Sequence, residues 1–359
     1  MFRMPSSVPS PVPRRGPTRL IAPLLALPLL AVAACGGGDA ASGGSSGDLT
    51  ALTIAEPVHG VGYLPLYVGI REGFFEEEGL DVSTVTLQGG GAHTNAVLTG
   101  EAWAFIGGPE HNAFAAARGG DAVTIKAVSN VVNRGNNYLV AAPDVTFDGD
   151  LGEFLEGKTI VTGAYGGTPN SILRYLLQEN DLEETDVTLI ESADANAALA
   201  ILQQGQAEVA VVSEPILGQG IDQGIWGEPF YNVPAEVGPY AYSTINVRQD
   251  SIEEDPDSVA AFARAMVKSL QFTESNQEEA FEVARKEFPT LDPAVLQETI
   301  DRAYADELWE YSGEVTPEAV ETALDVVRAA GILEDEDDPV QYDSIVDMSF
   351  IEDAQGSGG

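Results

Sequence analysis

The chain is short of cysteine and of basic residues, and each shortage narrows what it can do. One cysteine in 359 residues leaves no intramolecular disulfide to form. Seventeen Lys and Arg against 57 Asp and Glu give a formal net charge of −40. This excludes nucleic acid as a partner, because binding it requires cations that neutralise phosphates. The acids are scattered along the chain, which is typical of a solvated surface and favours a salt-rich environment that screens their repulsion.

Signals of catalysis or metal binding are also scarce. The chain has no Gly-x-Ser-x-Gly nucleophile motif, and its three histidines, His59, His93 and His111, match no short metal-ligand spacing. All three follow predicted strands of the first half, so a site in which the imidazoles converge on a metal is the alternative. We expect no catalytic residue, no metal and no cofactor.

The N-terminal residues are typical of an export signal. A basic segment precedes an apolar run over residues 20–34 that is too short to span a bilayer comfortably. Cys35 follows the small residues Val-Ala-Ala, and a Gly/Ser-rich stretch comes after it. We expect residues 1–34 to be a signal peptide for the general secretory route, with twin-arginine export as the alternative because of the pair Arg14-Arg15. Residues 35–48 are expected to be a flexible tether.

Hydrophobic periodicity predicts alternating strands and helices, which indicates parallel sheets, followed by helices alone. Expected strands lie at residues 49–55, 81–87, 102–106, 122–129, 138–142, 159–162, 187–190, 209–212 and 242–247. Expected helices lie at residues 66–78, 94–99, 110–118, 169–179, 193–204 and, as a long apolar stripe, 259–270. Asp292-Pro293 and Thr316-Pro317 have the residue types of an N-cap and a first helical residue, so two more helices begin there. We expect these C-terminal helices to pack on the first half.

Two stretches of the chain resemble each other. Residues 89–119 and 191–220 each read as a loop, a short apolar helix, a Gly-x-Ala turn, a buried strand and an acidic residue beside a proline. The duplication predicts two α/β lobes of similar plan. Ligands of open sheets bind beyond the carboxyl ends of the strands, so two such lobes facing each other would enclose a small molecule.

Several motifs resemble those of NMT1/THI5-like substrate-binding proteins of ABC importers, whose solutes include nitrate, sulfonates, taurine and thiamine-precursor pyrimidines. The motifs are YLPLYVGIREGFFEEEGLDVSTVTLQGGGAHTNAVLTGEAW from Tyr63, LEGKTIVTGAYGGTPNSILRYLLQENDL from Leu155, ALAILQQGQAEVAVVSEP from Ala198, and the closing YDSIVDMSFIEDA. The family usually has Gly-x-x-Asp before the third strand, where this chain has Trp103, while Glu208 keeps the acid in the second stretch. We interpret that acid as a structural residue at the start of a strand.

The resemblance covers residues 50–351 and implies an α/β type II periplasmic-binding-protein fold, with two parallel-sheet lobes joined by two crossovers. We assign residues 49–137 plus 246–351 to the first lobe and residues 138–245 to the second. Residues 352–359 are expected to form a disordered tail.

The resemblance also implies a function. The sequence VAAC ending at Cys35 resembles the lipobox of bacterial lipoproteins, so lipidation of Cys35 would anchor the chain to the outer face of the cytoplasmic membrane. The expected partners are a small-molecule solute and an ABC permease with its ATPase, and the chain is expected to be a monomer. The alternatives are an enzyme of the same fold and an extracytoplasmic sensor component.

The predicted solute site draws on loops at the strand ends of both lobes. The glycine loop before Thr168, a candidate N-cap, would present backbone N–H groups to an anionic head group. Glu56, Glu110 and Glu214 favour instead a cationic solute such as an amine or a protonated heterocycle. The expected ligand-binding residues, whose tyrosines would stack on a planar solute, are Glu56, His59, Tyr63, Gly90, His93, Thr94, Glu110, His111, Tyr165, Gly167, Thr168, Asn170, Ser171, Glu214 and Tyr242.

Overall fold

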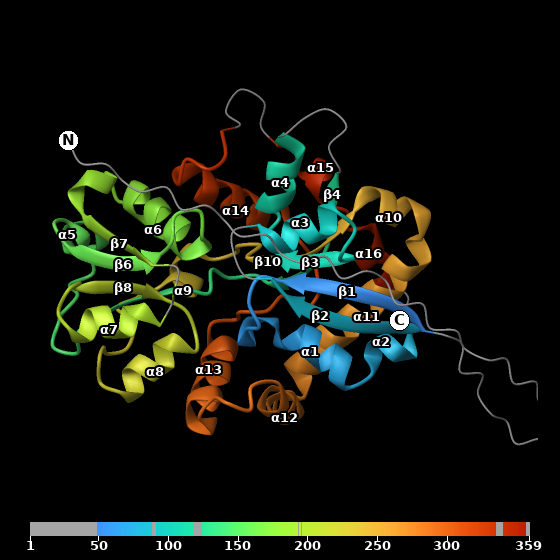
Figure 1. Ribbon diagram of the computed structural model, residues 1–359, viewed down its shortest axis with the longest axis horizontal. Helices are drawn as coiled ribbons and strands as arrows, with labels where there is room; N and C mark the ends of the chain where they lie inside the picture. Colours follow the sequence, from blue (N-terminus) through green and yellow to red (C-terminus); the bar gives the residue numbers. More distant parts are fainter. Residues whose placement is uncertain are drawn as a thin grey trace, which may run out of the picture. The chain divides into compact units, whose positions relative to one another are not determined.

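The computed structural model describes residues 49–87, 91–117, 124–192, 194, 196–334 and 340–356. The predicted signal peptide, the tether with Cys35, and Gly90 lie outside these residues. Strands of the described part form two five-stranded sheets (Figure 1). The first sheet contains β1 (Thr50–Glu56), β2 (Leu80–Thr86), β3 (Ala104–Gly107), β4 (Ile125–Val132) and β10 (Ser243–Arg248). The second contains β5 (Tyr138–Ala141), β6 (Thr159–Gly163), β7 (Thr188–Ser192), β8 (Val209–Val212) and β9 (Tyr231–Asn232).

Each sheet combines parallel strands with antiparallel ones, which the sequence did not predict. The first sheet has the order β2-β1-β3-β10-β4, with β10 antiparallel to β3 and β4. The second has the order β7-β6-β8-β5-β9, with β5 antiparallel to β8 and β9. Parallel neighbours need a long crossover connection. The chain reaches both β5 and β10 from the other sheet, without a crossover inside their own sheet, so these strands are free to run in the opposite direction.

Helices cover both faces of each sheet. The first half contains η1 (Val61–Tyr63), α1 (Leu64–Arg71), α2 (Phe74–Glu77), α3 (Ala92–Leu98) and α4 (Glu110–Ala117). Between β5 and β10 lie α5 (Leu151–Leu155), α6 (Thr168–Glu179), η2 (Glu184–Asp186), α7 (Ala197–Gln203), α8 (Ile216–Asp222) and α9 (Val233–Val237). After β10 come α10 (Gln249–Glu254), α11 (Pro256–Ser275), α12 (Gln277–Glu287), α13 (Pro293–Ala305), α14 (Pro317–Ala329), α15 (Tyr342–Ile345) and α16 (Ser349–Gly356). Figure 1 shows α6 on one face of the second sheet and α7 and α8 on the other.

Side chains alternate between the two faces of β1 and β3, so successive residues of each strand belong to different core clusters. Ile54 and Ile106 are fully buried in the cluster that contains α1, α2 and α11, whereas Ala55 and Phe105 are buried in the cluster that contains α3. Helices α1 and α11 approach closely at Gly69, where an added Cβ would lie 2.2 Å from a side-chain oxygen of α11. The long C-terminal helix α11 is therefore part of the first lobe, as its apolar stripe predicts.

The repeated stretches fold as two copies of one unit. Helices α3 and α7 each end at a glycine with positive φ, Gly100 at 77° and Gly205 at 65°, and each leads into a four-residue buried strand. The acid of the second copy has the structural role that we predicted, since Glu208 accepts a 2.9 Å hydrogen bond from the N–H of Thr159 at the start of β6. Trp103 of the first copy packs its ring 5.1 Å from that of Phe262 on α11.

The predicted helix starts at Asp292 and Thr316 are confirmed, because their side chains accept hydrogen bonds from the N–H groups of Ala294 and Ala319. The C-terminal helices pack on the first lobe, as expected, but two of them also contact the second lobe. Helix α13 places Ile300 in the core cluster of the first sheet and also contacts α8. Helix α14 contacts both α4 and α6 and places Ala323 in the core cluster of the second sheet. A periodic pattern does not show which lobe each buried residue of such a helix contacts.

The predicted tail is wrong over residues 352–356, which belong to α16. Ile351 anchors this helix, since it is 1 % exposed and packs against Ala263 and Val267 of α11. The side chain of Asp347 accepts a hydrogen bond from the Ser349 N–H at the start of the same helix. Residues 357–359 lie outside the described residues.

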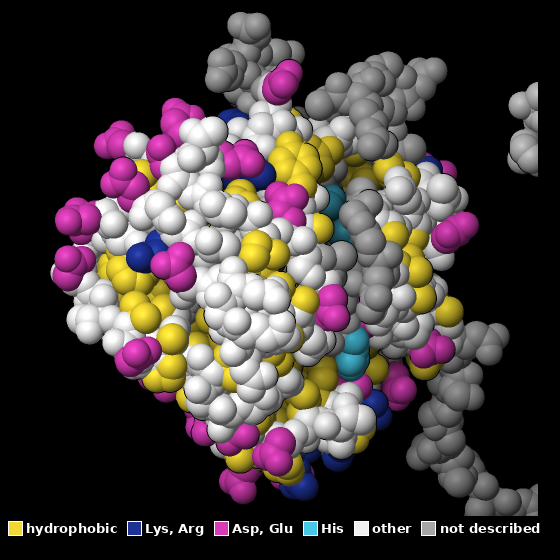
Figure 2. All heavy atoms as spheres, turned by 60° about the vertical axis from the view of Figure 1, so that its left-hand side comes forward, with side chains coloured by type: hydrophobic (Ala, Val, Ile, Leu, Met, Phe, Trp, Pro, Cys, Tyr) yellow, Lys and Arg dark blue, Asp and Glu magenta, His cyan; other side chains and the backbone are white. Residues whose placement is uncertain are grey.

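The acidic side chains are spread over the surface. Figure 2 shows Asp and Glu scattered across the face in view, with few Lys or Arg among them. No helix of the described residues combines the length and the apolarity needed to cross a membrane.

Candidate functional site

One cavity, of about 430 Å³, lies where the parallel strands of the second sheet end. Its lining includes Gly163, Ser192 and Val212, which are the last residues of β6, β7 and β8. The loop between β6 and α6 contributes Tyr165 and Gly167, two of the predicted ligand-binding residues. The cavity therefore occupies the position where open sheets bind their ligands.

A second cavity, of about 290 Å³, is lined by residues of α3 and α4 and by the β6–α6 loop of the other lobe. The predicted residues Thr94 and His111 line it. Gly166 lines both cavities and has a φ of +81°, in the left-handed region that favours glycine. The β6–α6 loop, which has no side chain at Gly166, therefore lines a cavity in each lobe.

The start of α6 differs from the prediction. Gly167, and not Thr168, is the N-cap, because its carbonyl accepts the N–H groups of Asn170 and Ser171 at 3.1 Å each. Pro169 is therefore the second helical residue and brings no N–H group. Among the described contacts, only the N–H of Thr168 in this turn has no acceptor. The helix start thus offers an anion far fewer donors than we expected.

Asn170 and Ser171 hydrogen-bond within the second lobe. The buried amide of Asn170 donates to the Gly163 carbonyl at 3.2 Å and to Glu191 at 2.9 Å, and it accepts from Arg174 at 2.7 Å. The Ser171 hydroxyl donates to the Gly167 carbonyl at 3.3 Å. These two side chains therefore fix the shape of the β6–α6 loop.

Tyr165 is the most exposed of the predicted residues, with 56 % of its surface accessible. Its hydroxyl donates to the carbonyl of Ala330, just beyond α14, at 3.2 Å. The Arg174 guanidinium lies 5.1 Å from the centre of its ring, in the geometry of a cation–π contact. One edge of the ring lines the cavity of the second lobe, so Tyr165 is available to a solute.

His93, Thr94 and His111 form a compact group between α3 and α4. The two imidazole rings lie 4.8 Å apart, and the Thr94 hydroxyl is 3.1 Å from Nδ1 of His111. Burial lowers the pKa of His93 to about 4, and burial together with His93 lowers the pKa of His111 to about 3. Both rings are therefore neutral near pH 7. Neither nitrogen of His93 has a hydrogen-bond partner among the described residues.

Glu110 begins α4 beside this group and is 5 % exposed. Its Oε1 lies 4.0 Å from Nε2 of His111, and its Oε2 is buried without a described hydrogen-bond partner. Burial raises the pKa of the Glu110 carboxyl to about 8. The carboxyl folds back over Gly108, where an added Cβ would lie 1.9 Å from Oε2, so a larger residue there would displace the carboxyl.

Three buried tyrosines interact electrostatically with Glu110. Its charge raises the pKa values of Tyr63, Tyr240 and Tyr242, although burial is the main cause for each. The hydroxyl of Tyr240 is buried without a described partner, whereas that of Tyr242 accepts a 3.2 Å hydrogen bond from the Asn137 amide. We did not predict Tyr240 or Asn137. The sequence Tyr-Ala-Tyr before β10 could have indicated Tyr240. Two aromatic residues two positions apart at the start of a strand lie on the same face of the sheet, so Tyr240 accompanies Tyr242.

Glu56 and His59 belong to a different cluster. The Glu56 carboxylate accepts hydrogen bonds from Tyr67 at 2.7 Å and Thr86 at 2.8 Å, and it lies 3.0 Å from His59 Nδ1. The other ring nitrogen of His59 is 3.7 Å from Glu287 on α12. These contacts join β1, β2, α1 and α12. They also separate His59 from the other two histidines, and the described residues hold no group of three His, Cys, Asp or Glu suited to a metal ion.

Glu214 forms a contact between the second lobe and α13. Its carboxylate lies 3.1 Å from the guanidinium of Arg302 and accepts hydrogen bonds from the Gly218 N–H and the Thr299 hydroxyl. Burial raises its pKa in spite of the facing Arg302. Gly218 belongs to α8, and Thr299 and Arg302 belong to α13, so the Glu214 carboxylate connects these two helices.

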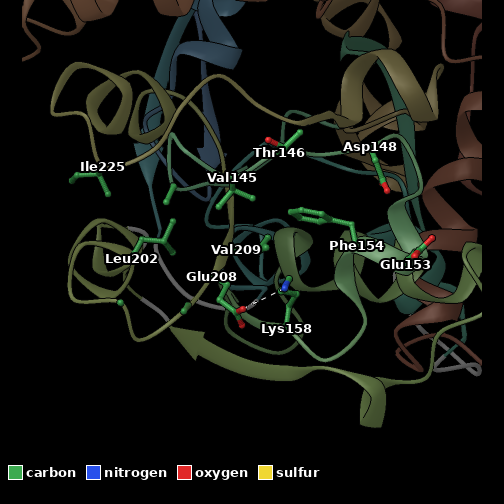
Figure 3. Close-up of a pocket in the computed structure, with 13 residues that line it drawn as sticks. Val145, Thr146, Asp148, Glu153, Phe154, Lys158, Leu202, Glu208, Val209 and Ile225 are labelled. Carbon is green, nitrogen blue, oxygen red and sulfur yellow. Dashed lines mark ion pairs between the residues drawn. The ribbon is translucent and has the colours of Figure 1, made fainter.

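A larger hollow, of about 720 Å³, lies at the opposite ends of the second sheet's strands. Figure 3 shows the side chains of Val145 and Phe154 in it, with Lys158 and Glu208 paired at one side. The Lys158 Nζ is 3.4 Å from Glu208 Oε1. Because Glu208 also fixes the start of β6, this ion pair has a structural role.

Comparison with known proteins adds to this geometry. Residues 61–280 match the family model described as NMT1/THI5 like. The chain is 30 % identical over 258 residues to the putative binding protein YtlA of Bacillus subtilis (strain 168), a match that covers 71 % of this chain and 75 % of that one.

Two solved structures share the fold. The alkanesulfonate-binding protein SsuA of Xanthomonas axonopodis pv. citri, bound to MOPS, aligns with a TM-score of 0.62 at 16 % identity and covers 80 % of this chain and 96 % of that one. The periplasmic nitrate-binding protein NrtA of Synechocystis PCC 6803 aligns with a TM-score of 0.65 at 15 % identity and covers 87 % and 89 %.

Proposed function

The chain belongs to the NMT1/THI5-like family, and we propose on this premise that it is the solute-binding protein of an ABC importer. The observation that carries the proposal is the shared position of Gly166, which lines a cavity of the second lobe and a cavity of the first. A small molecule at this point contacts residues of both lobes. Binding then stabilises the form in which the lobes are closed on the solute, and a permease with its ATPase receives it.

The division into lobes is part of the proposal. Residues 49–137 plus 246–351 form the first lobe and residues 138–245 the second. The start of β10 at Ser243 supports a second crossover a few residues before the proposed boundary.

The site in this proposal is smaller than the set expected from the sequence. It keeps the residues that line the cavities or lie beside Glu110. They are Tyr63, His93, Thr94, Glu110, His111, Tyr165, Gly167 and Tyr242.

The N-terminal segment supports a proposal about where the protein is located in the cell. We propose that residues 1–34 are removed, that Cys35 is lipidated, and that residues 35–48 tether the folded part to the outer face of the cytoplasmic membrane. An attached diacylglycerol gives stable anchoring where one acyl chain would not.

A thermal-shift screen tests the function. The probes are nitrate, taurine, alkanesulfonates, amines and aminopyrimidines, and a true solute at 100 times its Kd adds about 2.7 kcal/mol of apparent stability. Ser213→Phe fills the cavity of the second lobe and should abolish the shift, whereas Ser275→Phe, at the exposed end of α11, should keep it. A shift that survives Ser213→Phe would contradict the site.

The same experiment separates the alternatives. A binding protein releases its solute unchanged, so mass spectrometry of the released molecule should return the probe that was added. Recovery of a converted product would favour an enzyme of this fold instead.

A further inference from the structure

The buried carboxyl of Glu110 is one of several polar groups that have no partner. Nine such side-chain atoms occur in the described residues, and they include Oε2 of Glu110, both ring nitrogens of His93, the hydroxyl of Tyr240 and Oδ1 of Asn137. Each such atom destabilises a folded protein when it is left unsatisfied. Groups of this kind in one place are typical of a site that is completed by water or a ligand.

The charges of the surrounding residues favour a positively charged ligand over a negatively charged one. Of the described residues, no Lys or Arg lines either cavity. Arg174 lies over the ring of Tyr165, which lines one cavity, and it is paired with Glu184 and Glu191. A buried anion here would have no formal positive charge to offset its loss of hydration. A buried cation would have the carboxyl of Glu110 to offset its loss of hydration.

We infer that Glu110 determines the specificity of the site and that the solute is a small organic cation, either a protonated amine or a nitrogen base that takes up a proton. This inference rests on the proposed solute-binding function and narrows it to one chemical class. The cation donates to Oε2 of Glu110, and its apolar part lies against Tyr63 and Tyr242. The neutral imidazole of His93 accepts any second N–H group of the solute.

The proton balance of this binding follows from the groups that face Glu110. These are His111 on its own helix, His93 on α3, Tyr63 on η1, and Tyr240 and Tyr242 before β10. All are neutral near pH 7, and burial keeps the pKa of Glu110 at about 8 in the empty site.

An arriving cation ionises the carboxyl, whose proton is released to solvent. A neutral base instead accepts that proton and becomes the cation. A fixed cation therefore binds more tightly as the pH rises to about 8, by up to tenfold for each pH unit, and its affinity is constant above that value.

The test uses the folded part of the full chain with three variants. Glu110→Gln removes the charge with little change of shape, Glu110→Asp keeps the charge, and Glu298→Gln makes the same chemical change at an exposed position of α13. Each protein is incubated with yeast extract, and the captured small molecules are identified by native mass spectrometry. Benzylamine, which stays protonated from about pH 6 to about pH 8, and benzenesulfonate serve as defined probes of equal ring size in calorimetry.

The expected result is capture of a solute with a basic nitrogen, and benzylamine binding that exceeds benzenesulfonate binding. Glu110→Gln should weaken binding of the captured solute by about 30-fold or more, because it leaves a buried cation without its partner. Glu110→Asp should recover part of the loss, and Glu298→Gln should bind like the unaltered protein.

Three results would overturn the inference, and they point to different faults. Capture of an anion, or of a solute without a basic nitrogen, contradicts the chemical class and leaves the importer function standing. Equal affinity of Glu110→Gln and the unaltered protein for a base contradicts the role of Glu110. If no small molecule is captured and no probe binds, the proposed function itself fails.

Discussion

Replacing Glu110 by glutamine should change how stability depends on pH. The unfolded chain loses the Glu110 proton near the ordinary glutamate pKa of 4.5, whereas burial in the folded state keeps it up to about pH 8. Between these values the folded state binds one proton more than the unfolded state. The free energy of unfolding therefore falls as the pH rises through this window, and it is constant above about pH 8.

The structure sets the size of this effect. A pKa that moves from 4.5 to about 8 corresponds to about 5 kcal/mol at 1.36 kcal/mol for each pKa unit. Glu110 is 5 % exposed, so solvent screening is small and a loss of about 3–5 kcal/mol is expected. His93 and His111 have lowered pKa values and act in the opposite direction, because their unfolded imidazoles bind protons below about pH 6.5.

Urea denaturation of the ligand-free protein at about pH 5 and about pH 8 measures the effect. The histidine contribution is common to the unaltered protein and to Glu110→Gln, so it cancels in the difference between them. Stability of Glu110→Gln relative to the unaltered protein should rise by about 3–5 kcal/mol across this interval, and Glu298→Gln should show no such rise. Parallel pH profiles for all three proteins would refute the reasoning that Glu110 is protonated by burial.

Three further predictions follow from other contacts. Arg302→Met removes the partner of buried Glu214 and should lower the free energy of unfolding, measured by urea denaturation, by about 2–4 kcal/mol. Arg285→Met, at an exposed ion pair, should lower it by less than about 1 kcal/mol. Equal losses would contradict a structural role for Glu214. The net charge of −40 should make the urea midpoint rise as NaCl increases to about 1 M, and a fall would contradict self-repulsion. Cys35→Ser should move the protein from the membrane fraction to the soluble fraction, and continued membrane association would exclude a lipid anchor on this residue.

Much of the fold could be predicted from the sequence because the signals are local. The run Val209–Val212 is apolar and bounded by turn residues, and it is β8 to the residue. The pairs beginning at Asp292 and Thr316 cap helices because an oxygen side chain before proline satisfies a backbone donor. Such features depend only on neighbouring residues, so the rest of the molecule does not need to be known.

The parts that were missed depend on tertiary contacts. Ala323 fits the apolar stripe of α14 equally well against either lobe, and only the folded chain shows that it packs on α6. Glu56, Glu110 and Glu214 all lie at or just after the end of a strand. Partners distant in sequence satisfy Glu56 and Glu214, whereas Oε2 of Glu110 has no described partner. Thr168 has the residue type of an N-cap, but the carbonyl of Gly167 takes that role.

A crystal structure of the protein with its captured solute tests the central claim most directly. The account predicts electron density for the solute between the Glu110 carboxyl and the loop at Gly166, in contact with residues of both sheets. Density confined to the hollow beside Lys158 and Glu208, or to one lobe alone, would contradict a solute-binding protein that closes its two lobes on its ligand.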